Sequence, residues 1–178
     1  MTRTFLRTVL ACSLAGAAIA AHADGDAIGI RLKVGYHVTQ SFELRDHSSG
    51  HLEGPEISAD FPLSKVPGLQ FFVTPSVMFG GQLTHGHDVD GTIYRFMLTA
   101  RETISKDGLY GAVAAGAAHS ESRGLNEFKD QNGFVSSVTV GMPLKFKILG
   151  VTPSLEGSYY ISGQDQFRGF SITLSASF

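Results

Sequence analysis

The sequence contains no tryptophan, a single cysteine and few charged residues. Cys12 lies in an N-terminal segment that we expect to be removed, so the mature chain can form neither a disulfide nor a thiolate metal site. Lysine and arginine are scattered and the formal net charge is −2, which argues against nucleic acid as a partner. Beyond this segment no apolar run reaches the roughly 18 residues of a membrane helix, which excludes a helical membrane protein.

The N-terminus has the parts of an export signal. Arg3 and Arg7 precede an apolar stretch from Val9 to Ala21, and Ala21-His22-Ala23 matches the A-x-A site of a signal peptidase. The stretch is shorter than the roughly 20 residues that a membrane-spanning helix needs. We therefore expect residues 1–23 to be a cleaved signal peptide and residues 24–178 to form one domain.

Most of the chain alternates between apolar and polar residues, the period of a β-strand. The C-terminus shows this best, because serine and threonine separate the apolar residues Phe170, Ile172, Leu174, Ala176 and Phe178. In the fifth segment the side chains between Ala112 and Ala118 are small on both faces, so the pattern does not determine the register of this strand. The predicted strands span approximately 27–45, 51–63, 68–83, 92–104, 108–120, 133–146, 150–162 and 167–178.

Composition indicates which face of this sheet is outside. The polar face is mostly glycine, serine and threonine, whereas a sheet surface in water would be rich in lysine and glutamate. The apolar face places aromatic residues near segment ends, as the interfacial girdles of membrane barrels do. These residues are Tyr36, Phe42, Phe61, Phe71, Phe79, Tyr94, Phe134, Phe146, Tyr159, Phe170 and Phe178. The sequence thus predicts an all-β, eight-stranded antiparallel transmembrane β-barrel, an up-and-down meander in a bacterial outer membrane. The alternative is a soluble periplasmic barrel that binds a small apolar ligand.

The connections between segments alternate in length. Those near 64–68, 105–107 and 147–149 are short, and those near 46–50, 84–91 and 121–132 are mostly longer and more polar. Short periplasmic turns and longer outer loops are typical of transmembrane barrels. Pro75 and Pro153 lie in similar stretches, and because proline cannot donate to the ladder we expect each at a strand start or bulge near the periplasmic rim. The third strand then begins later than residue 68.

These features resemble the small eight-stranded outer-membrane barrels, such as OmpX and the membrane domain of OmpA. The resemblance covers the mature chain and includes two short motifs. One is the C-terminal strand ending in Phe178, which is similar to the signal read by the outer-membrane assembly machinery, with Ala176, Leu174, Ile172 and Phe170 on its apolar face. The other is a proline-to-glycine strand opening from Pro75 to Gly81. The chain departs from many members in having no tryptophan.

A barrel of eight strands has an interior that side chains just fill, so we expect no open channel. Charges held there must be paired, because an isolated buried charge costs several kcal/mol. We expect a salt-bridged interior in which Arg31 pairs with Asp60. The predicted inward charges are Arg31, Lys33, Glu43, Arg45, Glu56, Asp60, Arg95, Arg101 and Glu156.

Histidines gather in the expected outer loops. His47 and His51 flank the first loop, and His85 and His87 lie in the second with Asp88 and Asp90. Imidazole and carboxylate together can bind zinc, nickel or copper. The other interpretation is that these are ordinary polar loop residues. No cofactor is otherwise expected.

A catalytic function is a further possibility, because some outer-membrane barrels modify lipid A. The nearest match is His119-Ser120, but adjacent residues of a strand point to opposite faces and cannot form a nucleophile–base pair. We predict no catalytic residues and a non-enzymatic monomer with a structural, envelope-integrity or adhesive role. A lipid A-modifying enzyme is the alternative. The expected partners are lipopolysaccharide, phospholipid and the outer-membrane assembly machinery.

Overall fold

The computed structural model describes residues 29–43, 49–84, 87–122, 128–147 and 151–178, of which 82–84 and 87–89 are described by their backbone alone. The expected signal peptide lies outside the described residues. Among those residues no helix is long and apolar enough to cross a membrane.

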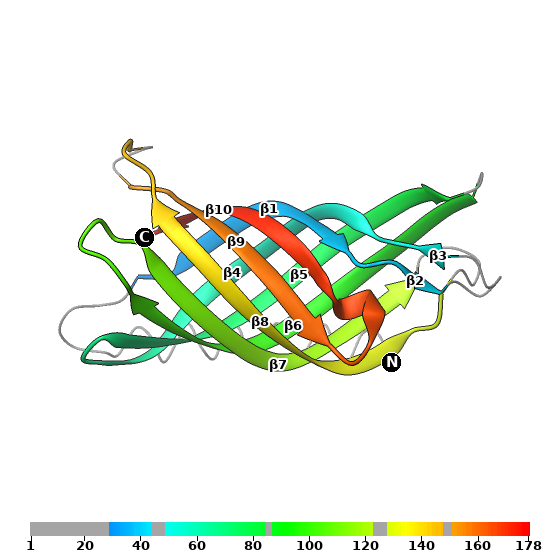
Figure 1. The fold of residues 1–178 in the computed structure, drawn as a ribbon, viewed down its shortest axis with the longest axis horizontal. Helices are drawn as coiled ribbons and strands as arrows, with labels where there is room; N and C mark the ends of the chain where they lie inside the picture. Colours follow the sequence, from blue (N-terminus) through cyan, green and yellow to red (C-terminus); the bar gives the residue numbers. More distant parts are fainter. Residues whose placement is uncertain (1–28, 44–48, 85–86, 123–127, 148–150) are drawn as a thin grey trace.

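Eight antiparallel strands close into a barrel (Figure 1). They are β1 (Arg31–Thr39), β4 (Glu53–Val66), β5 (Leu69–Thr84), β6 (His87–Thr103), β7 (Tyr110–Ser122), β8 (Gln131–Pro143), β9 (Ser154–Ser162) and β10 (Gly169–Ser177). Each pairs with the next along the chain, and β1 closes the barrel by pairing with β10 from Arg31–Ser177 to Thr39–Gly169. The predicted meander is confirmed. Three short elements lie between the strands, namely β2 (Phe42–Glu43), β3 (Ser49–Gly50) and the 3₁₀ turn η1 (Asp165–Phe167).

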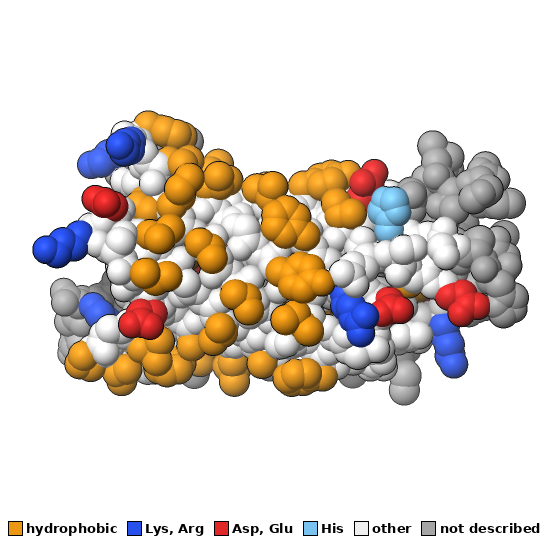
Figure 2. All heavy atoms as spheres, viewed as in Figure 1, with side chains coloured by type: hydrophobic (Ala, Val, Ile, Leu, Met, Phe, Trp, Pro, Cys, Tyr) orange, Lys and Arg blue, Asp and Glu red, His pale blue; other side chains and the backbone are white. Residues whose placement is uncertain are grey.

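The alternation of the sequence becomes an apolar outer wall and a polar interior. In β10, Ser171 and Thr173 are buried inside the barrel while Ile172 and Leu174 are exposed on its outer wall. Figure 2 shows hydrophobic side chains over the middle of the wall and charged side chains toward its two ends. A soluble barrel would turn its apolar face inward, so the orientation contradicts the soluble alternative.

The two ends of the barrel differ. One end, which we call the turn end, holds the start of β1, the end of β10 and the short connections at 67–68 and 104–109 (Figure 1). Gly68 and Gly108 have φ angles of 82° and 86° there, which side chains with a Cβ rarely adopt. The other end, the loop end, carries β2, β3 and η1.

The expected loop at 84–91 is wrong, because β5 and β6 stay paired as far as Thr84–His87 and leave only residues 85 and 86 between them. The expectation that Pro75 lies at a strand start or a bulge is also wrong, because β5 begins at Leu69 and the register shift of the β4–β5 ladder lies between Pro62 and Ser64. In the described ladders Pro75 lies opposite Phe96 of β6, and neither it nor Thr74 has a partner in β4. Pro153 does lie just before β9, as predicted.

Candidate functional site

The interior near the turn end holds a group of charged residues. Lys33 Nζ lies 2.9 Å from Asp60 Oδ2 and 3.0 Å from Glu156 Oε2. Arg31 Nη1 lies 3.3 Å from Glu156 Oε1, and Arg101 Nη1 lies 3.7 Å from Asp60 Oδ2. The Tyr110 hydroxyl donates to Glu156 Oε1 at 2.7 Å. We call this group the turn-end cluster: Arg31, Lys33, Asp60, Arg101, Tyr110 and Glu156.

The side chain of Arg31 goes to Glu156 rather than to Asp60, its expected partner. Arg31 and Asp60 are directly opposite in the β1–β4 register. Lys33 and Arg101 both reach Asp60 Oδ2, however, and Arg31 extends across the interior instead. Arg31 therefore does not form its ion pair with the residue directly opposite it on the neighbouring strand.

A second group, the central cluster, lies deeper in the barrel and consists of His37, Glu56, Arg95 and Tyr160. All four side chains are buried. Glu56 Oε1 lies 3.4 Å from Arg95 Nη1 and accepts the Tyr160 hydroxyl at 2.9 Å, while Glu56 Oε2 lies 3.3 Å from His37 Nδ1. The Arg95 guanidinium also stacks 4.2 Å from the centre of the Tyr160 ring. Glu56 and Arg95 thus pair with each other, and Tyr160 contacts both, Glu56 through its hydroxyl and Arg95 through its ring.

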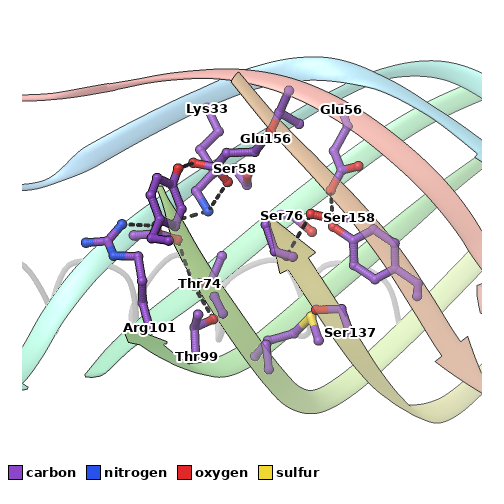
Figure 3. Close-up of a pocket in the computed structure, with 18 residues that line it drawn as sticks. Lys33, Glu56, Ser58, Thr74, Ser76, Thr99, Arg101, Ser137, Glu156 and Ser158 are labelled. Atoms are coloured by element: carbon purple, nitrogen blue, oxygen red, sulfur yellow. Dashed lines mark hydrogen bonds and ion pairs between the residues drawn. The ribbon is translucent and has the colours of Figure 1, made fainter. Parts of the chain in front are cut away.

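A cavity of about 30 Å³ separates the two clusters (Figure 3). Its wall includes Lys33, Asp60 and Glu156 from the turn-end cluster and Glu56 and Tyr160 from the central cluster. Serine and threonine make up most of the remaining wall, together with Arg101, Tyr110, Met97, Ala112 and Ala114. A cavity of this size has room for water but not for a larger solute.

An apolar cluster extends from the loop end of the interior down to the level of the central cluster, which the sequence did not predict. It consists of ten buried side chains, of which Tyr160 also belongs to the central cluster, and we call it the apolar plug: Phe42, Leu52, Met78, Ile93, Met97, Ala118, Phe128, Val135, Tyr160 and Phe167. The Phe42 and Phe128 rings meet edge to face with centroids 5.6 Å apart. Assignment of Phe42 to the outer aromatic girdle is therefore wrong. β1 ends at Thr39, so the alternation stops before Phe42 and the chain folds over the barrel mouth.

The clusters follow one another along the strands. From the turn end, Asp60 and Glu56 of β4 are followed by Leu52, which belongs to the apolar plug. Of the predicted inward charges, the seven on the eight strands of the barrel all point inside. Glu43 in β2 is exposed at the loop end, so the expectation that it points inward is wrong, and Arg45 lies outside the described residues. Those seven are Arg31, Lys33, Glu56, Asp60, Arg95, Arg101 and Glu156.

Sequence reasoning missed His37, Tyr110 and Tyr160 as members of these clusters. A signal existed for two of them, because His37 lies four residues after Lys33 and Tyr160 four residues after Glu156, which places each on the inward face of its strand. The small residues of β7 gave no comparable signal for Tyr110.

The structure places His119 and Ser120 on opposite faces of β7, as predicted. The Ser120 hydroxyl is buried inside the barrel and accepts a hydrogen bond from Gln166 Nε2. His119 lies outside, with Nδ1 2.9 Å from Asn132 Oδ1 and Nε2 3.2 Å from Glu121 Oε1. This pair cannot act as nucleophile and base.

The proposed histidine metal site stays a prediction. His47 and His85 lie outside the described residues, as do the side chains of His87 and Asp88. His51 Nε2 lies 3.8 Å from Glu53 Oε2. Among the side chains that the structure describes, no group of three or more histidine, cysteine or acidic residues is placed to hold a metal ion.

The predicted assembly signal lies on the outer wall. Phe170, Ile172, Leu174 and Phe178 are exposed there, and Ala176 is half-buried. The Phe178 amide donates to the Ile30 carbonyl at 2.9 Å, which extends the closing β1–β10 seam past the last strand residue.

A closed barrel of eight antiparallel strands, with an apolar outer wall and a filled interior, is the fold of the small outer-membrane β-barrels. The structure is similar to Neisserial surface protein A, with a TM-score of 0.57 and 14% identity over 84% of this chain and 97% of that one. It also matches Ail of Yersinia pestis (TM-score 0.47, 15% identity, 84% and 97% covered) and the N-terminal barrel of Pseudomonas aeruginosa OprF (0.41, 14%, 85% and 98%). At such identities the likeness shows the fold alone. No protein-family model and no curated protein matches the sequence.

Proposed function

We propose that this chain is an exported, monomeric outer-membrane protein that stabilises the envelope and contacts other molecules through its loop end. The signal peptide expected at residues 1–23 would direct export, and the assembly machinery would insert the barrel among lipopolysaccharide and phospholipid. The turn end would face the periplasm, because transmembrane barrels have short periplasmic turns.

The filled interior is the observation that supports this proposal. Two ionic clusters and the apolar plug, which overlaps the central cluster at Tyr160, together fill the barrel. The cavity between the ionic clusters has room only for water. A barrel closed in this way acts through its outer surfaces rather than by passing a solute.

The proposal is tested in cells that lack the protein and are complemented with wild-type or variant chains. One variant, Asp90→Lys with Asp130→Lys, reverses two exposed acidic residues at the loop end. Its matched control, Glu102→Lys with Asp107→Lys, makes the same charge change at the turn end. Adhesion to a surface and resistance to detergent are then measured.

We expect loss of the protein to reduce both properties, and the loop-end variant to reduce adhesion alone. The turn-end control should restore both. Equal adhesion by the two variants would refute a role for the loop end in contact. Unchanged detergent resistance without the protein would refute the envelope role.

A further inference from the structure

The central cluster contains a histidine that is completely enclosed by the barrel. His37 of β1 is 0% exposed. Its Nε2 lies 3.0 Å from Arg95 Nη2 of β6, and its Nδ1 lies 3.3 Å from Glu56 Oε2 of β4. The Tyr160 ring of β9 packs edge-on against the imidazole, with ring centroids 5.2 Å apart. Three other strands therefore contact this one ring.

The contact with Arg95 determines where the imidazole carries its hydrogen. A guanidinium group has only donors and no acceptor. Arg95 Nη2 must therefore donate to His37 Nε2, which accepts with its lone pair. The ring hydrogen is then on Nδ1, beside the Glu56 carboxylate. His37 is thus a neutral imidazole with its hydrogen on Nδ1.

A second proton on His37 would break this arrangement. Taken up from water, the proton would form an N–H bond at Nε2, and the hydrogen bond from Arg95 would be lost. Two cationic donors would then face each other across 3.0 Å. Glu56 is already 3.4 Å from Arg95 and accepts the Tyr160 hydroxyl, so one carboxylate would have to balance two positive charges.

The rest of the interior supplies no further negative charge. The turn-end cluster holds Asp60 and Glu156 against three cations, and both carboxylates already pair with them. β10 carries no titratable side chain. Its Gly169 packs so closely that a Cβ there would lie 2.7 Å from His37 Nε2, which leaves the ring little space to turn away. The charged or titratable groups that face His37 are therefore Glu56, Arg95 and Tyr160 alone among the described residues.

We propose that His37 makes the central cluster an acid-sensitive switch. As a neutral imidazole, His37 accepts the hydrogen bond of Arg95 and helps to hold the interior closed. When protonated, it displaces Arg95 from Glu56 and Tyr160 and loosens the middle of the barrel. Histidine changes charge between about pH 5 and 8, so the switch responds to mild acid. This inference is independent of what the loop end contacts.

The direction of the pH effect follows from proton binding in the two states. In an unfolded chain imidazole becomes protonated below about pH 6.5. A folded barrel that keeps His37 neutral binds fewer protons than the unfolded chain below that pH, so its stability falls as the pH falls. Carboxylates of an unfolded chain titrate near about pH 4. A comparison of about pH 7.5 with about pH 5 therefore reports mainly on histidine.

The test is urea unfolding of the refolded mature chain in lipid vesicles at these two pH values. His37→Gln is the variant, because an amide stays uncharged at both and its carbonyl can accept from Arg95. His119→Gln is the matched control, since His119 lies on the outer wall and contacts Asn132 and Glu121 instead. In detergent, ¹⁵N NMR of the histidine-labelled wild type reports which ring nitrogen carries the hydrogen. The His37 ring is identified by its proximity to the Tyr160 ring.

We expect acid to raise the unfolding equilibrium constant of the wild type, by about thirtyfold more than that of His37→Gln if His37 stays neutral in the folded barrel. His119→Gln should show no such reduction. The spectra should place the hydrogen on Nδ1 at about pH 7.5. Where acid protonates His37 in the folded barrel, the Tyr160 ring resonances should shift with it.

Three results would overturn the switch. They are equal pH dependence of wild type and His37→Gln, a hydrogen on Nε2 of His37 at about pH 7.5, and protonation of His37 that leaves the Tyr160 resonances unchanged. If His37→Gln does not fold, the last two decide alone, because both are measured on the wild type.

Discussion

Tyr160 donates its hydroxyl hydrogen to Glu56 across the barrel interior, at 2.9 Å and 104 positions apart in the chain. The same carboxylate lies beside Arg95, which is fully buried. Of the described ion pairs, Arg95 takes part only in the one with Glu56. Glu56 is therefore the residue whose removal would leave a positive charge unpaired inside the barrel.

We expect Glu56→Ala to lower the free energy of unfolding by about 3–5 kcal/mol, the cost of breaking a buried ion pair from one side. Tyr160→Phe removes one hydrogen bond to the same carboxylate and should cost about 1 kcal/mol. Urea unfolding of the barrel in lipid vesicles, followed by tyrosine fluorescence, measures both.

The control replaces both charges, as Glu56→Leu with Arg95→Met. An apolar pair of similar volume leaves no charge unpaired, so this double variant should be more stable than Glu56→Ala. If Glu56→Ala were as stable as Tyr160→Phe, the ion pair would not contribute to holding the interior closed.

The same substitution to arginine at two positions of the outer wall tests how deep each position lies in the membrane. Leu98 is 60% exposed on the wall and Ile104 is 64% exposed beside the turn end. Leu98→Arg should cost about 2–4 kcal/mol if it lies at the bilayer midplane, and Ile104→Arg about 0–1 kcal/mol near the interface. Unfolding in vesicles gives both values, and equal costs would contradict a transmembrane placement.

Thr99→Arg tests the opposite face next to Leu98. Thr99 is buried inside and lines the small cavity close to Arg101. The added guanidinium meets limited space and a like charge, so this variant should be destabilised in detergent as well as in lipid. The loss at Leu98→Arg should appear only in lipid.

Assembly is expected to depend on Phe178, the exposed aromatic residue at the end of the apolar face of β10. Deleting Phe178 should lower the yield of heat-modifiable barrel in the outer membrane and leave unfolded chain in the periplasm. Phe146→Ala is the control, because Phe146 is also an exposed aromatic near the turn end but lies outside β10. Normal yield after the deletion would refute an assembly signal at the C-terminus.

The two-residue period predicted the strands well, because successive side chains of a barrel strand point alternately to the apolar outer wall and to the polar interior. Segment 108–120 became β7 (Tyr110–Ser122), and segment 167–178 became β10. The prediction failed where a strand stops, as at Phe42. Alternation indicates whether a side chain points inward or outward only as long as the strand continues. It also failed for residues 87–90, since polar side chains do not prevent backbone pairing at the end of the β5–β6 hairpin.

The partners within the interior were harder to predict. Alternation indicated that Arg31 and Asp60 point inward. It could not indicate that the long side chain of Arg31 extends across the lumen and contacts Glu156. Met78 shares its strand face with Ser76 and Ile93 shares its face with Arg95, so alternation indicated that both point inward but not that they join an apolar cluster. The central cluster joins His37, Glu56, Arg95 and Tyr160 from four different strands, and only the closed barrel brings them together.

The apolar plug should stabilise the barrel and keep its loop end closed. Phe128 is 2% exposed within the plug, whereas Phe134 is 68% exposed on the outer wall. Phe128→Ala should cost about 3–5 kcal/mol, because the barrel cannot collapse around the cavity left behind. Phe134→Ala should cost less, since lipid can fill the space vacated on the wall. Urea unfolding in vesicles compares the two.

The same pair of variants tests closure. In a planar bilayer the wild type and Phe134→Ala should show no steady conductance, because the plug and the ionic clusters fill the lumen. Phe128→Ala should remain closed or conduct only in brief events, since Arg95 and Glu56 still lie beneath the opened mouth. Combining Phe128→Ala with Glu56→Ala removes both levels and should raise conductance above either single variant. A steady channel in the wild type would contradict the filled interior on which the proposed function rests.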